Sequence, residues 1–137
     1  MSSAPSSWTI RAKPRFGRDL KRLAKDLYKS KGQREKFKAF VEGIYDLLEQ
    51  AGPFHPKLDA KLIRLGSGQL PQGRQLFKLY LRPPETRGES GEMRIIALAC
   101  PSLRTVELLM AYTHADYAKQ PSDQEILARM REEEPSP

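Results

Sequence analysis

The sequence contains a single cysteine, Cys100, and only two histidines among its 137 residues. One cysteine excludes an internal disulfide, and so few thiol and imidazole groups do not supply the usual ligand set of a zinc site. No apolar run approaches the length of a membrane span, and the N-terminus carries no apolar signal core. We therefore expect a cytoplasmic protein that needs no metal and no cofactor.

Motifs that indicate common enzyme classes are missing as well. The chain has no glycine-rich phosphate loop, no GxGxxG, no HExxH and no GxSxG. Its acidic residues do not form the pair that a glycosidase requires. Cys100 ends the apolar run 95–100, where we expect a small buried thiol. Metal-dependent and covalent catalysis are therefore not expected.

Positive charge is what the chain has in excess. Twenty-four Lys and Arg face 17 Asp and Glu, for a net charge of +7. Residues 1–38 hold twelve basic and three acidic side chains, whereas residues 121–137 hold two basic and five acidic ones. A basic body with an acidic tail favours polyanionic partners, although simple solubility would also account for the charge.

Helical periodicity dominates the first third of the chain. A short strand at 8–11 precedes a helix that Pro14 opens, and a turn at 30–32, with Gly32 at the helix terminus, leads into a second helix at 34–50. The first helix has an apolar stripe and an opposite basic ridge. The ridge comprises Arg15, Arg18, Arg22, Lys25 and Lys29. We expect the two helices to form an antiparallel hairpin.

The period then changes to that of strands, expected at 61–65, 74–82, 93–99 and 105–112, with a polar loop at 83–92. This order predicts an α+β domain with the helical hairpin on one face of an antiparallel sheet. Ser122 and Glu125 form a capping-box pattern at the start of a C-terminal helix. We expect a disordered N-terminus at 1–7, the domain at 8–120, and the C-terminal helix with its acidic tail at 121–137.

The strand at 74–82 carries the most informative pattern. If Phe77, Leu79 and Leu81 pack under the helices, alternate side chains project from the other face. These are Arg74, Lys78, Tyr80 and Arg82, which Arg94 of the next strand can join. Cations around a tyrosine suit phosphates and a stacked base. A solvated outer sheet face would give the same pattern.

A second cluster follows the last strand, where His114 lies between Tyr112 and Tyr117. Histidine is the side chain best suited to proton transfer near neutral pH, so this cluster is a candidate for general acid or base chemistry. The tyrosines would equally serve to close the edge of the core, with His114 hydrogen-bonded beside them. His55 lies in a proline-flanked turn, where a structural role is expected.

The order of these motifs resembles the RelE/ParE toxin superfamily over residues 8–118. Four segments carry the resemblance: the basic helix at 14–23, the linker Phe54-His55-Pro56-Lys57-Leu58, the strand 76–82, and the pair 92–96 with 112–117. The resemblance implies a β-α-α-β-β-β fold. It also implies a metal-independent toxin of a type II toxin–antitoxin system that cleaves messenger RNA on the ribosome and is held in check by a cognate antitoxin.

By position, the resemblance implies catalytic roles for Lys78, Arg94, His114 and Tyr117. RNA-binding roles would fall to the remaining basic and aromatic candidates: Arg15, Arg18, Arg22, Lys25, Arg74, Tyr80 and Arg82. The chain departs from the RelE pattern where Tyr80 replaces an expected strand lysine and Thr113-His114 replaces a basic pair. Two alternatives therefore stay open: a non-catalytic RNA- or protein-binding module, and a ParE-like topoisomerase inhibitor.

The acidic, amphipathic C-terminal segment has two interpretations. It would occupy part of the RNA groove in cis, in the way an antitoxin segment does, or it would simply cover the core. The sequence gives no indication of the oligomeric state.

Overall fold

The computed structural model describes residues 7–66, 70–117 and 119–132, without the side chains of residues 89 and 90. The elements follow in the order β1 (Thr9–Ala12), α1 (Pro14–Leu27), α2 (Lys31–Ala51), the 3₁₀ turn η1 (Gly52–Phe54), β2 (Asp59–Ile63), β3 (Gln75–Leu81), α3 (Gly88–Gly91), β4 (Met93–Cys100), β5 (Thr105–Thr113) and α4 (Asp123–Met130). The expected disordered N-terminus, apart from Ser7, and the end of the acidic tail at 133–137 lie outside the described residues.

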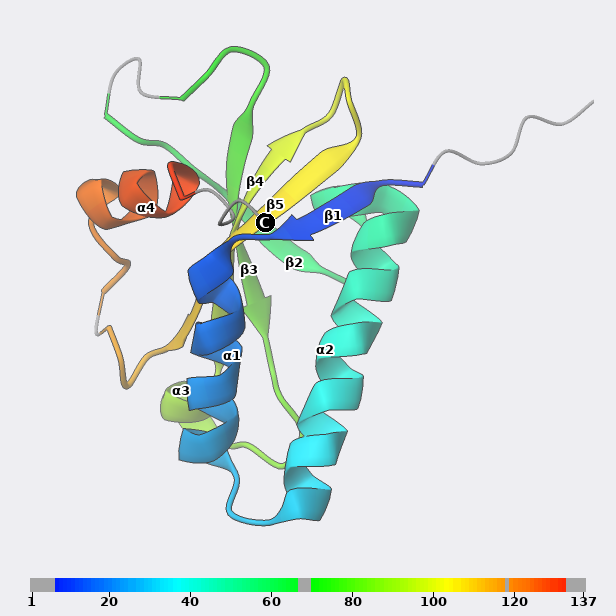
Figure 1. The fold of residues 1–137 in the computed structure, drawn as a ribbon, viewed down its shortest axis with the longest axis vertical. Coiled ribbons are helices and arrows are strands. Elements are labelled where there is room, and N and C mark those ends of the chain that lie inside the picture. Colours follow the sequence, from blue (N-terminus) through cyan, green and yellow to red (C-terminus); the bar gives the residue numbers. More distant parts are fainter. Residues whose placement is uncertain (1–6, 67–69, 118, 133–137) are drawn as a thin grey trace, which may run out of the picture.

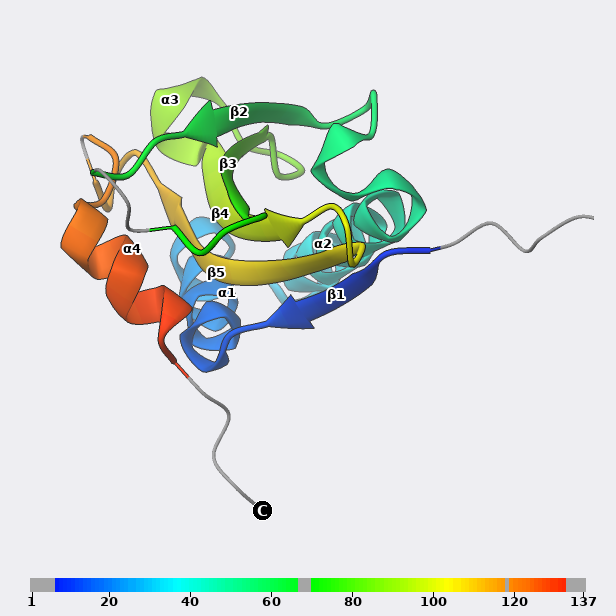
Figure 2. The same cartoon turned by 90° about the horizontal axis from the view of Figure 1, so that it is seen from above.

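The strands form one five-stranded sheet in the order β1-β5-β4-β3-β2 (Figures 1 and 2). Strands β2 to β5 pair antiparallel, as expected, because each of their connections reverses the chain direction. Strand β1 joins the edge parallel to β5, with Ile10 opposite Val106. This arrangement confirms the α+β fold and the order of one strand, two helices, four strands and a C-terminal helix that the sequence predicts, with the short helix α3 in addition.

The hairpin of α1 and α2 covers one face of the sheet (Figures 1 and 2). Phe16 and Leu23 of α1 and Ile44 of α2 are buried against the strand side chains Phe77 and Leu79. The apolar side chains that recur along the helices and along the strand therefore form one core. We call this side of the sheet the helix-covered face. Its burial of apolar surface is the main source of stability for a domain of this size.

The structure moves several element boundaries, and β2 begins at Asp59 and ends at Ile63 where a strand at 61–65 was expected. Helix α2 begins at Lys31 rather than Arg34, because the Ser30 hydroxyl accepts a hydrogen bond from the Gln33 amide and the Gln33 side chain reaches back to Ser30. The expected helix end at Gly32 is therefore wrong, and this glycine lies in the first turn of α2. The polar loop at 83–92 contains the short helix α3.

Helix α4 covers part of the opposite face, which we call the second face (Figure 2). Its residue Ile126 is fully buried, and Ser122 caps the helix by accepting from the Glu125 amide. Arg129 donates two hydrogen bonds to the carboxylate of Asp19 in α1, at 2.8 and 3.1 Å. Asp19 also accepts from the Ala111 amide of β5. Helix α4 is therefore a core-covering helix anchored to α1 and β5.

Candidate functional site

Three side chains line up across the second face beside α4. On β3, Lys78 and Tyr80 alternate with the buried Phe77 and Leu79 and so project away from the helical hairpin. The register places Tyr80 directly opposite Arg94 of β4, and Arg94 opposite Tyr112 of β5. A row of tyrosine, arginine and tyrosine therefore crosses three neighbouring strands.

Three cations surround the ring of Tyr80. Lys61 Nζ lies 4.9 Å from the ring centroid, Lys78 Nζ 5.3 Å, and the guanidinium carbon of Arg94 5.6 Å. The attraction between a cation and an aromatic ring offsets part of the repulsion between these like charges. Tyr80 therefore lies at the centre of the cation cluster, and its expected role in stacking a base stays a prediction.

Lys61 is the residue of this cluster that the sequence did not single out. It lies on β2 directly opposite Lys78, with Ile63 two residues further along the same face. The alternation of Lys61 and Ile63 is visible in the sequence, but the pairing of β2 with β3 is not. The cluster thus contains residues of β2, β3 and β4, whereas sequence analysis took its members from the strands at 74–82 and 93–99 alone.

Two of these cations, Lys78 and Arg94, border a hollow of about 270 Å³ that opens on the second face. Its lining residues come from β3, β4, the end of β5 and the segment before α4: Lys78, Tyr80, Arg94, Tyr112, His114, Tyr117, Lys119 and Gln120. We call this site the basic hollow. All four residues with expected catalytic roles lie in it, together with Tyr80.

Several lining side chains are already engaged by neighbours. Lys78 Nζ donates to the Gln120 side chain at 3.1 Å, and Arg94 pairs with Glu92 at 2.9 Å. The hydroxyl of Tyr117 donates to Glu125 of α4 at 2.7 Å. That hydrogen bond, together with burial, raises the pKa of Tyr117. The capping-box pattern predicts that the Glu125 carboxylate accepts from the backbone at the start of the helix. In the structure it accepts instead from Tyr117, which lines the hollow.

Two buried donors in the hollow lack a partner among the described residues. They are the Tyr112 hydroxyl and Nη1 of Arg94. Burial raises the pKa of Tyr112 to about 12, although the nearby positive charge of Arg94 lowers this pKa, and the phenol keeps its proton at neutral pH. Buried polar groups are nearly always paired, because leaving them unpaired costs free energy. Two such donors beside lysines suit an anionic acceptor such as a phosphate oxygen.

Four other RNA-binding candidates lie on the outer surface of α1, and one of them, Arg22, contacts the loop that follows β5. Arg15 forms an ion pair with Glu132, which follows α4 in the chain, whereas Arg18 and Lys25 line a basic groove. Arg22 lines the same groove and donates to Asp116 at 2.7 Å, and Asp116 in turn accepts from the Thr113 amide. This chain of contacts links the basic ridge of α1 to the loop that carries His114.

Two further candidates lie outside the hollow. Arg74 donates to the sulfur of Cys100, which is buried as expected, at the other end of β3 from Tyr80. Arg82 follows β3 and donates to the Gly88 carbonyl at 2.6 Å, inside the 83–92 loop. Both side chains therefore have local structural partners, and the structure does not bring them together with Lys78 and Arg94.

Within the described part of the chain, no group of three or more His, Cys, Asp or Glu side chains is placed to hold a metal ion. No helix in these same ranges has the length and apolar character needed to cross a bilayer. The side chains that line the hollow carry amines, one guanidinium group, phenols, one amide and one imidazole.

Comparison with known proteins gives similarity at the level of fold. One similar structure is a chain of the archaeal RelE–RelB complex from Pyrococcus horikoshii OT3, at 13% identity and a TM-score of 0.48 over 77% of this chain and 93% of that chain. Another is the conserved hypothetical protein HP0892 from Helicobacter pylori, at 16% identity and a TM-score of 0.47 over 80% and 97%. The sequence matches no protein-family model and, at a significant level, no curated protein.

Proposed function

We propose that this chain is a RelE-like toxin that binds messenger RNA on the ribosome and cleaves it at the basic hollow without a metal. The observation that carries the proposal is the pair of buried, unpartnered donors, Tyr112 and Arg94, beside the cations on Tyr80. A phosphate of the RNA backbone is the acceptor that this arrangement suits in both charge and hydrogen bonding.

Cleavage would use the nucleophile that the substrate itself carries. The 2′-hydroxyl attacks the adjacent phosphorus, the new O2′–P bond forms as the P–O5′ bond breaks, and a proton passes to the leaving oxygen. Arg94 and Lys78 would neutralise the charge that grows on the phosphate oxygens. His114 and Tyr117 lie at the same hollow and are the candidates for taking and giving the proton.

The basic ridge of α1 would supply the second part of the RNA interface. Arg18, Arg22 and Lys25 lie in one groove, and the Arg22–Asp116 contact connects this groove to the hollow. Phosphate contacts of this kind position a protein on RNA without specifying sequence. In this proposal a cognate antitoxin keeps the basic surface inactive until it is released.

The test is cleavage of a ribosome-bound messenger in a purified translation system. We expect cutting by the wild type and a loss of at least about 100-fold for Arg94→Ala, since removal of one charge-stabilising donor commonly costs that much. Arg11→Ala, an exposed arginine of β1, is the matched control and should cut normally. The same messenger without ribosomes tests the dependence on the ribosome.

One observation favours a second candidate, a non-catalytic RNA-binding module. Lys78 and Arg94 already have partners in Gln120 and Glu92, and such pairing reduces the charge available to a transition state. A folded wild type that binds RNA with Arg94-dependent affinity but cuts no messenger would establish that candidate. A wild type that neither binds nor cuts RNA would contradict both.

A further inference from the structure

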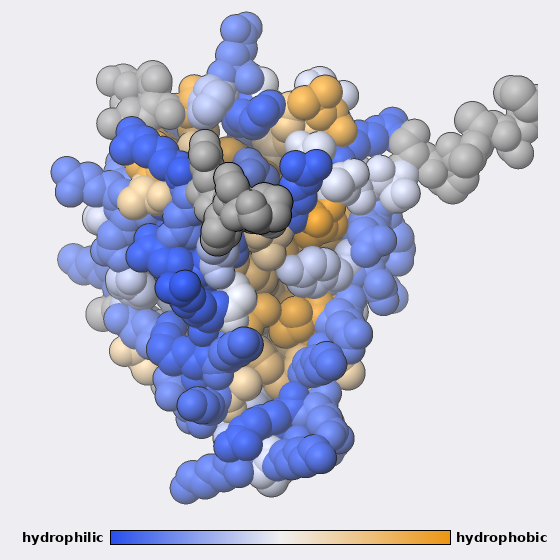
Figure 3. All heavy atoms as spheres, in the orientation of Figure 1, coloured by the Kyte–Doolittle hydropathy of each residue, from blue (hydrophilic) through white to orange (hydrophobic). Residues whose placement is uncertain are grey.

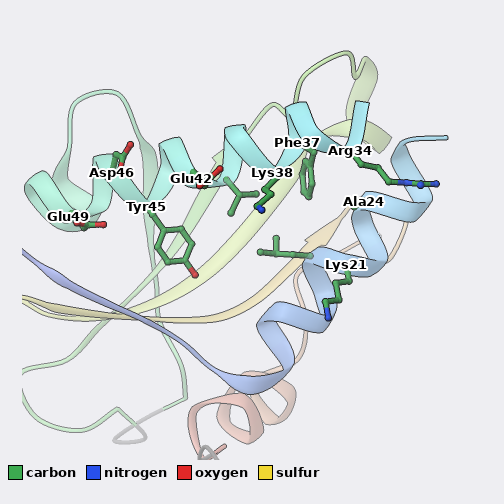
Figure 4. Close-up of a pocket in the computed structure, with 11 residues that line it drawn as sticks. Lys21, Ala24, Arg34, Phe37, Lys38, Glu42, Tyr45, Asp46 and Glu49 are labelled. Atoms are coloured by element: carbon green, nitrogen blue, oxygen red, sulfur yellow. The ribbon is translucent and has the colours of Figure 1, made fainter. Parts of the chain in front are cut away.

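An apolar groove runs along the outside of the helical hairpin, on the side away from the basic hollow. It has a volume of about 560 Å³, and its floor comes from Leu20 and Ala24 of α1 and from Phe37, Val41 and Tyr45 of α2. Figure 3 shows this band of apolar side chains between hydrophilic side chains of the two helices, and Figure 4 shows Phe37 and Tyr45 directed from α2 into it. An apolar band of this kind between helices marks a contact site.

The charges that border the groove are sorted along α2. Arg34 and Lys38 lie at its first half, and Glu42, Asp46 and Glu49 lie at its second half (Figure 4). None of these five side chains forms an ion pair with another residue in the described ranges, and all five are exposed. The groove therefore has an apolar centre, one basic end and one acidic end.

We propose that this groove is the interface of a twofold-symmetric homodimer in which α2 packs antiparallel to α2 of a second copy. With the twofold axis beside Val41, Arg34 of each copy faces Glu49 of the other, and Lys38 faces Asp46. The apolar side chains of the two copies meet at the centre, where Glu42 of each copy lies beside the axis without an opposite charge, so each half of the contact repeats the other. Residues 34 and 49 are about 22 Å apart along the helix, a length that spans the whole groove.

The order of charges selects this occupant over two others. A parallel arrangement of two copies would place Arg34 beside Arg34 and Glu49 beside Glu49, which repels at both ends. A uniformly acidic helix from another protein would pair with Arg34 and Lys38 but would meet Glu42, Asp46 and Glu49 along the second half. The antiparallel second copy satisfies both ends, and it does so without relying on the RNA proposal.

Charge reversal at the two ends tests the interface in full-length protein. Arg34→Glu places two carboxylates opposite each other at both ends of the contact, and Glu49→Arg places two arginines there, so each variant alone should be monomeric where the wild type is a dimer. Mixed in equal amounts, the two variants become complementary and should form a heterodimer. Sedimentation velocity over a range of protein concentrations measures all four samples. We expect the dissociation constant of the dimer to be at least about tenfold higher for each single variant than for the wild type.

Matched controls are reversals on the same helix outside the groove. Lys31→Glu and Glu35→Arg change the charge equally at exposed positions of α2 and should leave the dimer intact. Circular dichroism confirms that each variant is folded. A wild type that stays monomeric at every concentration overturns the proposal, as does a dimer that ignores the reversals. Failure of the mixed variants to associate overturns the antiparallel register.

Discussion

The two faces of the sheet use the same strands for different purposes. Along β3, Phe77 and Leu79 are buried beneath the helical hairpin, while Lys78 and Tyr80 between them face the basic hollow. The helix-covered face is apolar, whereas the second face combines an apolar cluster, which includes Ile126 of α4, with the basic hollow. The comparison shows that alternation along one strand lets one face bury apolar side chains while part of the other face gathers charges.

Asp19 connects the two faces, and its removal should have the largest effect on stability. Its carboxylate accepts from Arg129 of α4 and from the Ala111 amide of β5. Asp19→Ala leaves the half-buried Arg129 without its carboxylate partner, with only the Leu109 carbonyl as an acceptor, and we expect the free energy of unfolding to fall by about 3–5 kcal/mol in urea titrations. Asp26→Ala, on the same helix with an exposed Arg22 pair, should cost less than about 1 kcal/mol. Equal losses would show that the anchor is not what holds α4.

Leu79 tests the helix-covered face alone. It is fully buried against the hairpin, and Leu79→Ala should lower the free energy of unfolding by about 3 kcal/mol through lost contacts and the cavity left behind. Leu62→Ala on β2 removes the same atoms from a side chain that is 60% exposed, so its effect should stay within about 0.5 kcal/mol. Similar losses in the two variants would contradict the assignment of the core.

The helix-covered face was predictable because its information is local. The helical repeat of Phe16 and Leu23 and the alternation of Phe77 and Leu79 each appear within one segment, and together they predicted the layers and the order of elements. The end at Gly32 was mispredicted because the Ser30–Gln33 capping pair extends α2 through a residue with low helix propensity.

The second face was predictable only in part, since strand pairing determines which side chains meet. Lys78, Arg94 and Tyr80 follow from alternation within single strands, but the place of Lys61 depends on the register of β2 against β3. Arg82 has the correct alternation for the hollow, yet the chain leaves the sheet there and the side chain contacts Gly88. The Asp19–Arg129 contact joins residues 110 positions apart, beyond the reach of any local pattern.

Lys61 separates binding from stability on the second face. Its side chain is exposed and contacts Tyr80, so Lys61→Ala should change the free energy of unfolding by less than about 0.5 kcal/mol. On the proposed function it should weaken RNA binding and reduce the salt dependence of the binding constant by about one phosphate contact. Lys57→Ala, an exposed lysine before β2, is the control for charge alone. An equal loss in both variants would mean that only net charge matters.

Tyr112→Phe should change the stability only slightly, and with a sign opposite to that of a paired tyrosine. Its buried hydroxyl has no partner in the described chain, so Tyr112→Phe should leave the fold as stable or up to about 1 kcal/mol more stable. Tyr28 is the matched control, because its buried hydroxyl donates to the Pro84 carbonyl at 2.6 Å. Tyr28→Phe should therefore cost about 1 kcal/mol. On the proposed function, Tyr112→Phe lowers RNA affinity, so this hydroxyl would serve binding at the expense of the fold.

The pH dependence of stability supplies a second measurement on Tyr112. Burial raises its pKa from 10.0 to about 12, so between these values the folded state keeps a proton that the unfolded state has lost. Stability therefore falls as the pH rises through this window, and it is fully present below pH 10. Tyr112→Phe removes that proton, so the decline of its stability should be shallower than that of the wild type. The remaining decline comes from Tyr28 and Tyr45, whose pKa values burial raises, and from Tyr117, whose pKa the hydrogen bond with Glu125 raises. Urea titrations at stepped pH compare the two proteins, and identical slopes would place the Tyr112 phenol in contact with solvent rather than inside the hollow.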